Sequence, residues 1–140
     1  MPFFMGEYTY AMDDKGRVKI PLAFKSDLAP EAGAIVYLVR DNDECVAVYT
    51  PAEYQKLKDR LTVLDREDPA SRVKIRRQIS CAFEVEVDAQ GRIKVPTDLI
   101  KHARLPKGGE VKLAGFIDYI QIWNTDEYQK SMALQARSEA

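Results

Sequence analysis

The sequence predicts an α+β fold in which two copies of one β-hairpin unit, with flanking helices, build a β-core that has pseudo-twofold symmetry within one chain. A ten-residue motif occurs twice, as MDDKGRVKIP from Met12 and as VDAQGRIKVP from Val87. Its apolar, Asp, Gly, Arg, Lys and Pro positions recur in register. Apolar side chains also alternate before and after each motif, which is typical of strands. Near the end of each half, a capping sequence predicts the start of a closing helix.

The duplication extends beyond the motif. Asp13 and Asp88 lie 75 positions apart, and the word EYQK occurs at 53–56 and again 74 positions later. A single hairpin cannot bury its apolar face, whereas two related hairpins can cover each other. The sequence therefore divides into a first repeat over 4–56, an inserted helical segment over 57–80, a second repeat over 81–130 and a tail over 131–140.

Each repeat is expected to open on a hairpin. Aspartate at the first turn position and glycine at the fourth suit a type I turn, in which Gly16 and Gly91 take the positive φ. Pro21 and Pro96 then end the outgoing strand and begin a short helical turn. The side chains expected to face inward are Tyr8, Tyr10, Met12, Val18, Ile20, Phe24 and Leu28 in the first repeat, and Phe83, Val85, Val87, Ile93, Val95, Leu99, Ile100 and Ala103 in the second.

Two more strands and a closing helix follow in each repeat. The segment Thr50-Pro51-Ala52-Glu53 is a capping box with proline at the first helical position. In the second repeat, Asn124 and Glu127 have the same spacing of a capping residue and a glutamate three positions later. The first closing helix places Tyr54, Leu57, Leu61 and Leu64 on one face. Only the first repeat goes on to a further helix, capped by Asp68, with apolar positions at Val73, Ile75 and Ile79.

The composition is that of an ordinary globular protein, with 46% apolar and 31% charged residues in a chain of 140. No apolar run approaches the roughly 20 residues of a membrane span. The first residues, MPFFMGEYTYAM, lack the basic start and the apolar core of an export signal. We therefore expect a cytoplasmic protein that contacts no membrane.

Cysteine and histidine are too sparse to support catalytic or metal chemistry. Cys45 and Cys81 lie far apart in apolar surroundings, which favours buried free thiols over a disulfide. His102 is the sole histidine, and its charged neighbours indicate a surface position. No Ser-His-Asp order, phosphate loop or ligand-spaced cysteine pair occurs. We expect no metal, no cofactor and no enzymatic activity.

The charge is segregated, which leaves nucleic-acid binding open despite a net charge of −1. Acidic residues gather at 41–44 and 65–68, and basic residues gather at 72–77 and in the two motifs. The basic run at 72–77 is first interpreted as the solvated face of a helix and second as a contact to a neighbouring subunit. Tyr49 and Trp123, at matched places in the repeats, are interpreted as core or interface aromatics.

The motif cations have two interpretations. Lys15, Arg17 and Lys19 share one face if the outgoing strand is extended, and an arginine fork fits both phosphate and the guanine edge. The second motif keeps Arg92 and Lys94 but has Gln90 in place of the first lysine.

The simpler interpretation is that each arginine only pairs across the turn with the aspartate four residues before it, Asp13 or Asp88. Such an exposed pair is worth at most about 1 kcal/mol. The residues alone leave both interpretations standing.

The paired motifs resemble a known family. Asp-x-x-x-Arg hairpins followed by an apolar residue and proline are similar to those of the AbrB/SpoVT superfamily of swapped-hairpin DNA-binding proteins. Two such hairpins in one chain resemble the MraZ family. The resemblance is carried by FMGEYTYAMDDKGRVKIP, CAFEVEVDAQGRIKVP and LAGFIDYIQIW, and it runs from Phe4 to about Tyr128. It implies a swapped-hairpin β-barrel core.

In function, the resemblance implies a nucleoid-associated transcriptional regulator, generally a repressor, of the bacterial division and cell-wall gene cluster. It would bind double-stranded DNA at short direct repeats upstream of its own operon, as a ring-shaped homo-oligomer without catalytic activity or cofactor. Arg17, flanked by Lys15 and Lys19, would be the main reader, and Arg92 with Lys94 the second. The alternative is an AbrB-like antitoxin or assembly protein in which DNA binding is secondary.

Overall fold

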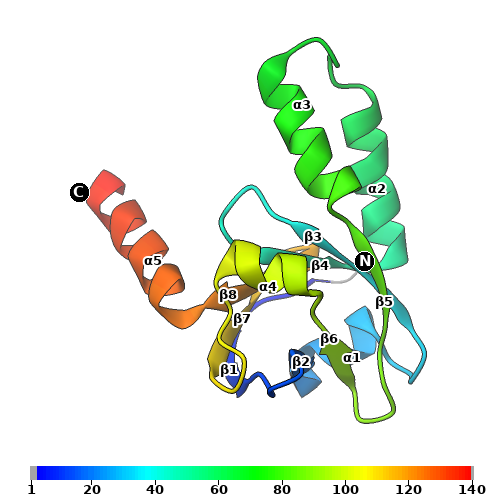
Figure 1. The fold of residues 1–140 in the computed structure, drawn as a ribbon, viewed down its shortest axis with the longest axis vertical. Coiled ribbons are helices and arrows are strands. Elements are labelled where there is room, and N and C mark those ends of the chain that lie inside the picture. Colours follow the sequence, from blue (N-terminus) through cyan, green and yellow to red (C-terminus); the bar gives the residue numbers. More distant parts are fainter. Residues whose placement is uncertain (1–2, 140) are drawn as a thin grey trace.

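The computed structural model describes residues 3–139, and the order of its elements occurs twice along the chain (Figure 1). The first half contains β1 (Glu7–Ala11), β2 (Arg17–Lys19), α1 (Leu22–Leu28), β3 (Ile35–Arg40), β4 (Val46–Tyr49) and α2 (Pro51–Thr62). The second half contains β5 (Phe83–Glu86), β6 (Arg92–Lys94), α4 (Thr97–Ala103), β7 (Glu110–Phe116), β8 (Tyr119–Asn124) and α5 (Thr125–Glu139). Between them lie α3 (Pro69–Ile75) and the π-helical turn η1 (Arg76–Ser80). The predicted α+β class is confirmed.

Both motifs form the predicted turn. Gly16 and Gly91 have φ values of 81° and 75°, which only glycine adopts without strain. The Gly16 N–H donates to the Asp13 carbonyl at 3.1 Å, and the Gly91 N–H donates to the Asp88 carbonyl at 3.0 Å. The same four-residue sequence pattern thus closes the same turn twice.

The helix starts also follow the sequence. Thr50 Oγ1 accepts the N–H of Glu53 at 3.1 Å, but the Glu53 carboxylate accepts from Lys56 instead of returning to the cap. Only half of the predicted capping box therefore forms. Asn124 Oδ1 accepts the N–H of Glu127 at 3.0 Å. Asp68 caps α3 by accepting the N–H of Ser71 at 3.0 Å.

The strands of the two halves are exchanged. The larger sheet has the order β1-β7-β8-β4-β3-β5, and β2 pairs only with β6. Each motif was expected to form a hairpin between its own two strands, and this is right only next to the turn, where the Asp13 N–H donates to the Arg17 carbonyl and the Asp88 N–H donates to the Arg92 carbonyl, each at 2.9 Å. Beyond it β1 pairs with β7, and β5 pairs with β3. The exchange lets each half bury its apolar face against the other, which a single hairpin cannot do alone.

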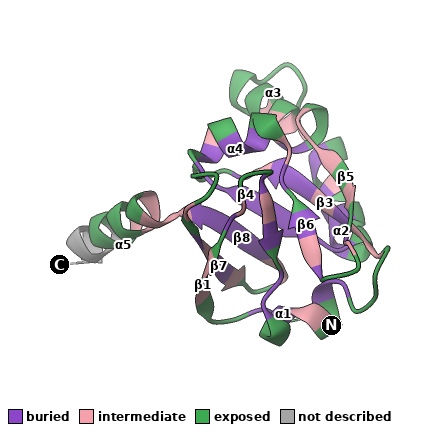
Figure 2. Cartoon of the chain, turned by 60° about the horizontal axis from the view of Figure 1, so that its bottom comes forward, coloured by how far each residue is buried: buried purple, intermediate pink, exposed green. Residues whose placement is uncertain are grey.

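The core lies between the larger sheet and the β2–β6 ribbon (Figure 2). It contains the inward side chains expected from the motifs, among them Met12, Val18, Ile20, Ile93 and Val95, all with 2% exposure or less. On the other face of the larger sheet, Tyr54, Leu57 and Leu61 of α2 pack against Val39, Ala47 and Tyr49. The burial of Tyr49 and Trp123 confirms that both are structural aromatics.

Several expectations need correction. In the further helix only Ile75 packs inward, because Val73 and Ile79 are 46% and 39% exposed. Cys81 is only partly buried, whereas Cys45 is fully buried, and both are free thiols. His102 is half-buried and not a surface residue; burial, together with the charge of Arg40, lowers its pKa.

The peripheral helices differ in how they meet the body. The helix α5 continues to Glu139, through the segment expected as a tail, and points away from the sheet (Figure 1). In the basic run, Arg72, Lys74 and Arg76 are exposed, as a solvated face predicts. Arg77 instead donates to the Asn42 carbonyl at 3.4 Å, so it contacts the acidic loop of its own chain. In residues 3–139 no helix has the length and apolarity to cross a membrane.

Candidate nucleic-acid interface

The β2–β6 ribbon has one apolar face and one cationic face. Val18 and Ile93 pair at its centre, and both are buried in the core. Side chains alternate along a strand, so the flanking residues of both strands point to the outer face. This cationic ribbon face consists of Arg17, Lys19, Arg92 and Lys94. Two motifs that lie 75 positions apart in sequence therefore supply one surface.

The register interleaves the cations of the two motifs. Arg17 lies opposite Lys94, and Lys19 lies opposite Arg92. Lys15 is exposed in the first turn, at the edge of the ribbon. All five cations expected at a DNA site are thus brought to one side of the molecule. The sequence could not show this, because it does not reveal which strand β2 would pair with.

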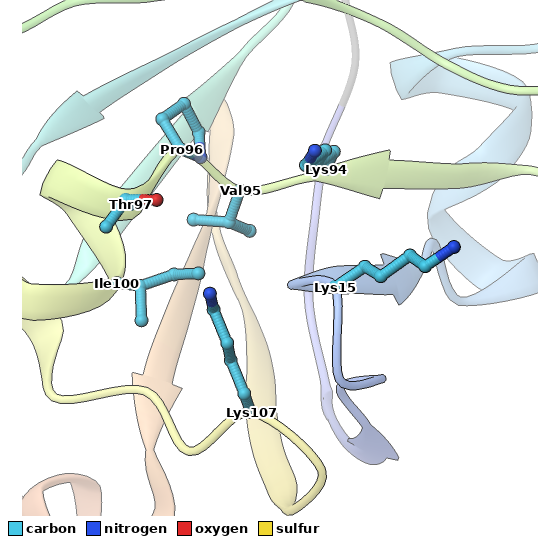
Figure 3. A pocket seen from close by; sticks show the side chains of 7 residues that line it. All are labelled: Lys15, Lys94, Val95, Pro96, Thr97, Ile100 and Lys107. Atoms are coloured by element: carbon cyan, nitrogen blue, oxygen red, sulfur yellow. The ribbon is translucent and has the colours of Figure 1, made fainter.

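A hollow lies beside each motif turn. The first is lined by Lys15, Lys94 and Lys107 together with apolar side chains (Figure 3). The second is lined by Lys19 and Lys25. Sequence reasoning missed Lys25 and Lys107, because they lie in α1 and in the loop after α4, outside the motifs, and no local spacing marks them.

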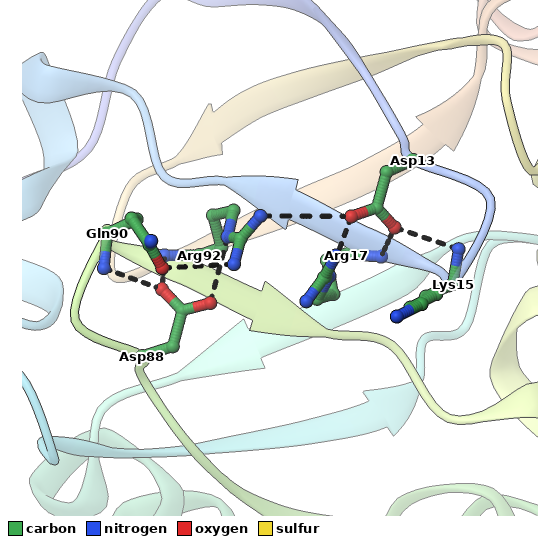
Figure 4. A network of polar contacts seen from close by, with 6 residues as sticks. All are labelled: Asp13, Lys15, Arg17, Asp88, Gln90 and Arg92. Atoms are coloured by element: carbon green, nitrogen blue, oxygen red, sulfur yellow. Dashed lines mark hydrogen bonds and ion pairs between the residues drawn. The ribbon is translucent and has the colours of Figure 1, made fainter.

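The aspartates hold the turns and orient the arginines (Figure 4). Asp13 Oδ1 accepts the backbone N–H groups of Lys15 and Arg17 at 2.9 and 2.8 Å, while its Oδ2 accepts Arg17 Nε at 2.6 Å. Asp88 makes the equivalent contacts with Gln90 and Arg92, each at 2.9 Å. The simpler interpretation is therefore right about the pairing. It does not exclude DNA contact, since each pair uses only Nε of the guanidinium.

The two arginines differ in their remaining nitrogens. Arg92 Nη2 donates to Gln90 Oε1 at 3.0 Å, and Arg92 Nη1 lies 3.9 Å from Asp13 Oδ2 of the other motif. The two terminal nitrogens of Arg17 have no partner among the described residues. The fork of Arg17 is thus free for a bidentate contact, while that of Arg92 is occupied.

Hydrogen bonds keep both turn carboxylates ionised. The backbone N–H of Arg17, aided by its side chain, lowers the pKa of Asp13 to about 2. Burial opposes a similar fall at Asp88, but the N–H and guanidinium of Arg92 still hold the pKa of Asp88 below its usual value. A carboxyl group whose pKa is lowered by folding stabilises the folded state at pH values above its pKa in the unfolded chain. This stabilisation is lost as the pH falls towards its pKa in the folded protein. The turns therefore keep their geometry at neutral pH.

The described residues contain no metal centre. Within 3–139 no group of three or more His, Cys, Asp or Glu side chains could hold a metal ion. The ribbon face offers only cations and turn carboxylates, and this arrangement suits recognition of an anionic polymer.

The sequence of this chain is similar to those of known proteins. A family model described as "MraZ protein, putative antitoxin-like" matches residues 3–77 and again 79–140. The transcriptional regulator MraZ of Alkaliphilus metalliredigens is 37% identical over 125 residues, covering 89% of this chain and 83% of that protein. The MraZ of Halothermothrix orenii is 38% identical over the same coverage. That of Cytophaga hutchinsonii is 34% identical over 139 residues, covering 99% of this chain and 90% of the relative.

Proposed function

Because this chain belongs to the MraZ family of transcriptional regulators, which are not enzymes, we propose that it represses transcription by binding double-stranded DNA through the cationic ribbon face. The main support for this proposal is that the pairing of β2 with β6 brings four cations from the two motifs onto one outward face. A two-stranded ribbon fits the major groove, which is about 12 Å wide. We further propose that this ribbon closes the larger sheet into a swapped-hairpin barrel.

Within this face the first motif is the main reader. The free fork of Arg17 can reach O6 and N7 of a guanine, a contact that also specifies the base. Lys15, Lys19 and Lys94 are point charges that suit phosphates. Arg92 is held by Asp88 and Gln90, so it contributes charge more than base recognition.

The proposed target is a set of short direct repeats upstream of the protein's own operon, in the division and cell-wall gene cluster. The family membership supports this assignment, and we propose with it that the protein is associated with the nucleoid. A gel shift with the chain's own upstream DNA, against a scrambled sequence of equal length, tests it. An antitoxin or assembly protein for which DNA is secondary would bind both DNAs equally weakly.

Operator binding is expected to weaken steeply with salt. Cations on the ribbon displace counterions, and each phosphate contact adds roughly 0.9 to the slope of log affinity against log salt concentration. Fluorescence anisotropy from 50 to 200 mM salt measures this slope. A complex that is insensitive to salt would show that the ribbon face is not the contact surface.

We also propose that the protein acts as a homo-oligomeric ring. A monomer with a net charge of −1 and one short ribbon makes few phosphate contacts, whereas several copies gain affinity through effective concentration. Exposed apolar side chains in two separate parts of the fold support such a contact: Val63 and Ile79 in the helical segment of α2, α3 and η1, and Phe116 and Ile117 at the β7–β8 tip. Unlike surfaces that meet head to tail generate rings.

Light scattering is expected to give a mass several times the 15.9 kDa of one chain. Because exposed apolar groups of this kind mark interaction sites, Ile79→Asp and Phe116→Asp should each lower that mass. Circular dichroism confirms that the variants fold, and Lys130→Asp, at an exposed position of α5, serves as a charge control. A wild-type monomer at micromolar concentration that binds the operator unchanged would contradict the ring.

A further inference from the structure

The two hollows beside the ribbon are not explained by base reading. We propose that both hold backbone phosphates of bound DNA, with Lys107 completing the first hollow and Lys25 the second. This inference rests on the proposed function and deepens it, because it adds two residues outside the motifs to the DNA contact.

The first hollow has a cationic rim and an apolar floor. It encloses about 360 Å³, and its seven lining residues include three lysines and no carboxylate. Figure 3 shows the side chain of Lys107 directed into the hollow towards Val95 and Ile100, with Lys94 and Lys15 on the ribbon side and the Lys15 side chain extending away from Lys107. In Figure 3 the ammonium end of Lys107 points into the hollow, where an anion bound there can reach it.

The second hollow repeats this arrangement at the other turn. It encloses about 240 Å³ and includes Lys19, Lys25 and Gln90, again without a carboxylate. A Cβ built on Gly91 would lie 3.8 Å from Lys25 Nζ, and one built on Gly16 would lie 3.9 Å from Lys107 Cε. One lysine therefore lies against each turn glycine.

These two lysines come from unrelated segments. Lys25 belongs to α1, whereas Lys107 lies in the loop between α4 and β7. The duplication itself did not place them, because the repeats carry no lysine at matching positions here: Lys25 corresponds to Ile100. Lys25 and Lys107 nevertheless lie at equivalent places beside the two turns. This is the arrangement expected if each turn binds an anion.

The chemistry fits phosphate. Among the described residues neither Lys25 nor Lys107 forms an ion pair, so both charges are available. Lysine is a point charge that binds phosphate oxygens without reading sequence, and such contacts fix the register of a protein on the duplex.

The two hollows also differ in charge, and this difference sets the orientation of the ribbon on DNA. The first contains three lysines, whereas the second has Gln90 where the first has Lys15. A symmetric ribbon would accept DNA in either orientation. Because the stronger phosphate site lies at one end only, each protomer binds in one orientation, as reading direct repeats requires.

The test compares Lys107→Gln and Lys25→Gln with the control Lys130→Gln, which removes one exposed charge from α5, the helix that points away from the sheet (Figure 1). For each phosphate that a variant no longer binds, the affinity ratio between 50 and 200 mM salt should shrink about 3.5-fold, equally on operator and scrambled DNA. The control should leave the ratio unchanged. Thermal melts verify that each variant folds.

A second arm locates the phosphates. Operator DNAs that each carry one uncharged methylphosphonate are scanned for positions that weaken wild-type binding. One such position should have no effect in Lys107→Gln and a different one should have none in Lys25→Gln. If both lysine variants keep the wild-type salt slope and the full methylphosphonate pattern, this inference is overturned while the proposed function stands. A wild-type protein that binds no DNA overturns both.

Discussion

Arg17→Ala is expected to cost about 1–3 kcal/mol of operator-binding free energy, and Arg92→Ala is expected to cost less. The difference follows from the contacts of the two guanidinium groups. The terminal nitrogens of Arg17 lack a partner in the described part of the chain, whereas those of Arg92 meet Gln90 and Asp13. Binding isotherms on operator and single-base variants of it measure the effect.

Binding and melting measurements on the two arginine variants also distinguish three possible roles of Arg17. If Arg17 reads a guanine edge, its loss relaxes discrimination at one operator position. If it contacts only phosphate, affinity falls equally on all sequences and the salt slope shrinks by about one. If the pair with Asp13 is its whole purpose, the melting temperature falls and operator affinity per folded molecule stays unchanged. A well-folded Arg17→Ala protein with wild-type binding would contradict the site assignment.

Ile93→Ala is expected to reduce the free energy of unfolding by about 2–5 kcal/mol. Ile93 has no exposed surface, and it pairs with Val18 directly beneath the cationic ribbon face. Removing three methyl or methylene groups there leaves a cavity between the ribbon and the larger sheet. Urea unfolding followed by circular dichroism measures the reduction.

Ile93→Val is the matched control for this change. It removes a single methylene and should cost only about 0.5–1.5 kcal/mol. If Ile93→Ala reduces the free energy of unfolding by less than Ile93→Val does, the ribbon does not cover the core. Arg17→Ala, by contrast, should weaken binding and leave the protein folded, so the two kinds of variant separate the scaffold from the contact surface.

Much of the local structure could be predicted from the sequence because local rules decide it. An Asp-x-x-Gly turn needs a residue tolerant of positive φ at one position, so Gly16 and Gly91 mark both turns. Side-chain alternation placed Val18 and Ile93 inward, and therefore their charged neighbours outward. Oxygen-bearing caps followed by proline placed the starts of α2 and α3.

Burial at single positions was less predictable. His102 has charged sequence neighbours, but the side chain is half-buried and near Arg40. Val73 fits a helical apolar pattern and is nevertheless exposed on α3. In both cases the deciding factor is which element packs on the helix, and a helix pattern states only which residues share a face.

By itself the sequence determined the duplication, the two turns, the helix starts and the charge of each motif. Only the tertiary structure decided that β1 leaves its own hairpin for β7, and that β2 pairs with β6. That exchange joins cations 75 positions apart on one face and brings Lys25 and Lys107 to the turns. The physical reason is that strand pairing is chosen by burial of apolar surface between distant segments, whereas a local pattern fixes only backbone angles and the direction of each side chain.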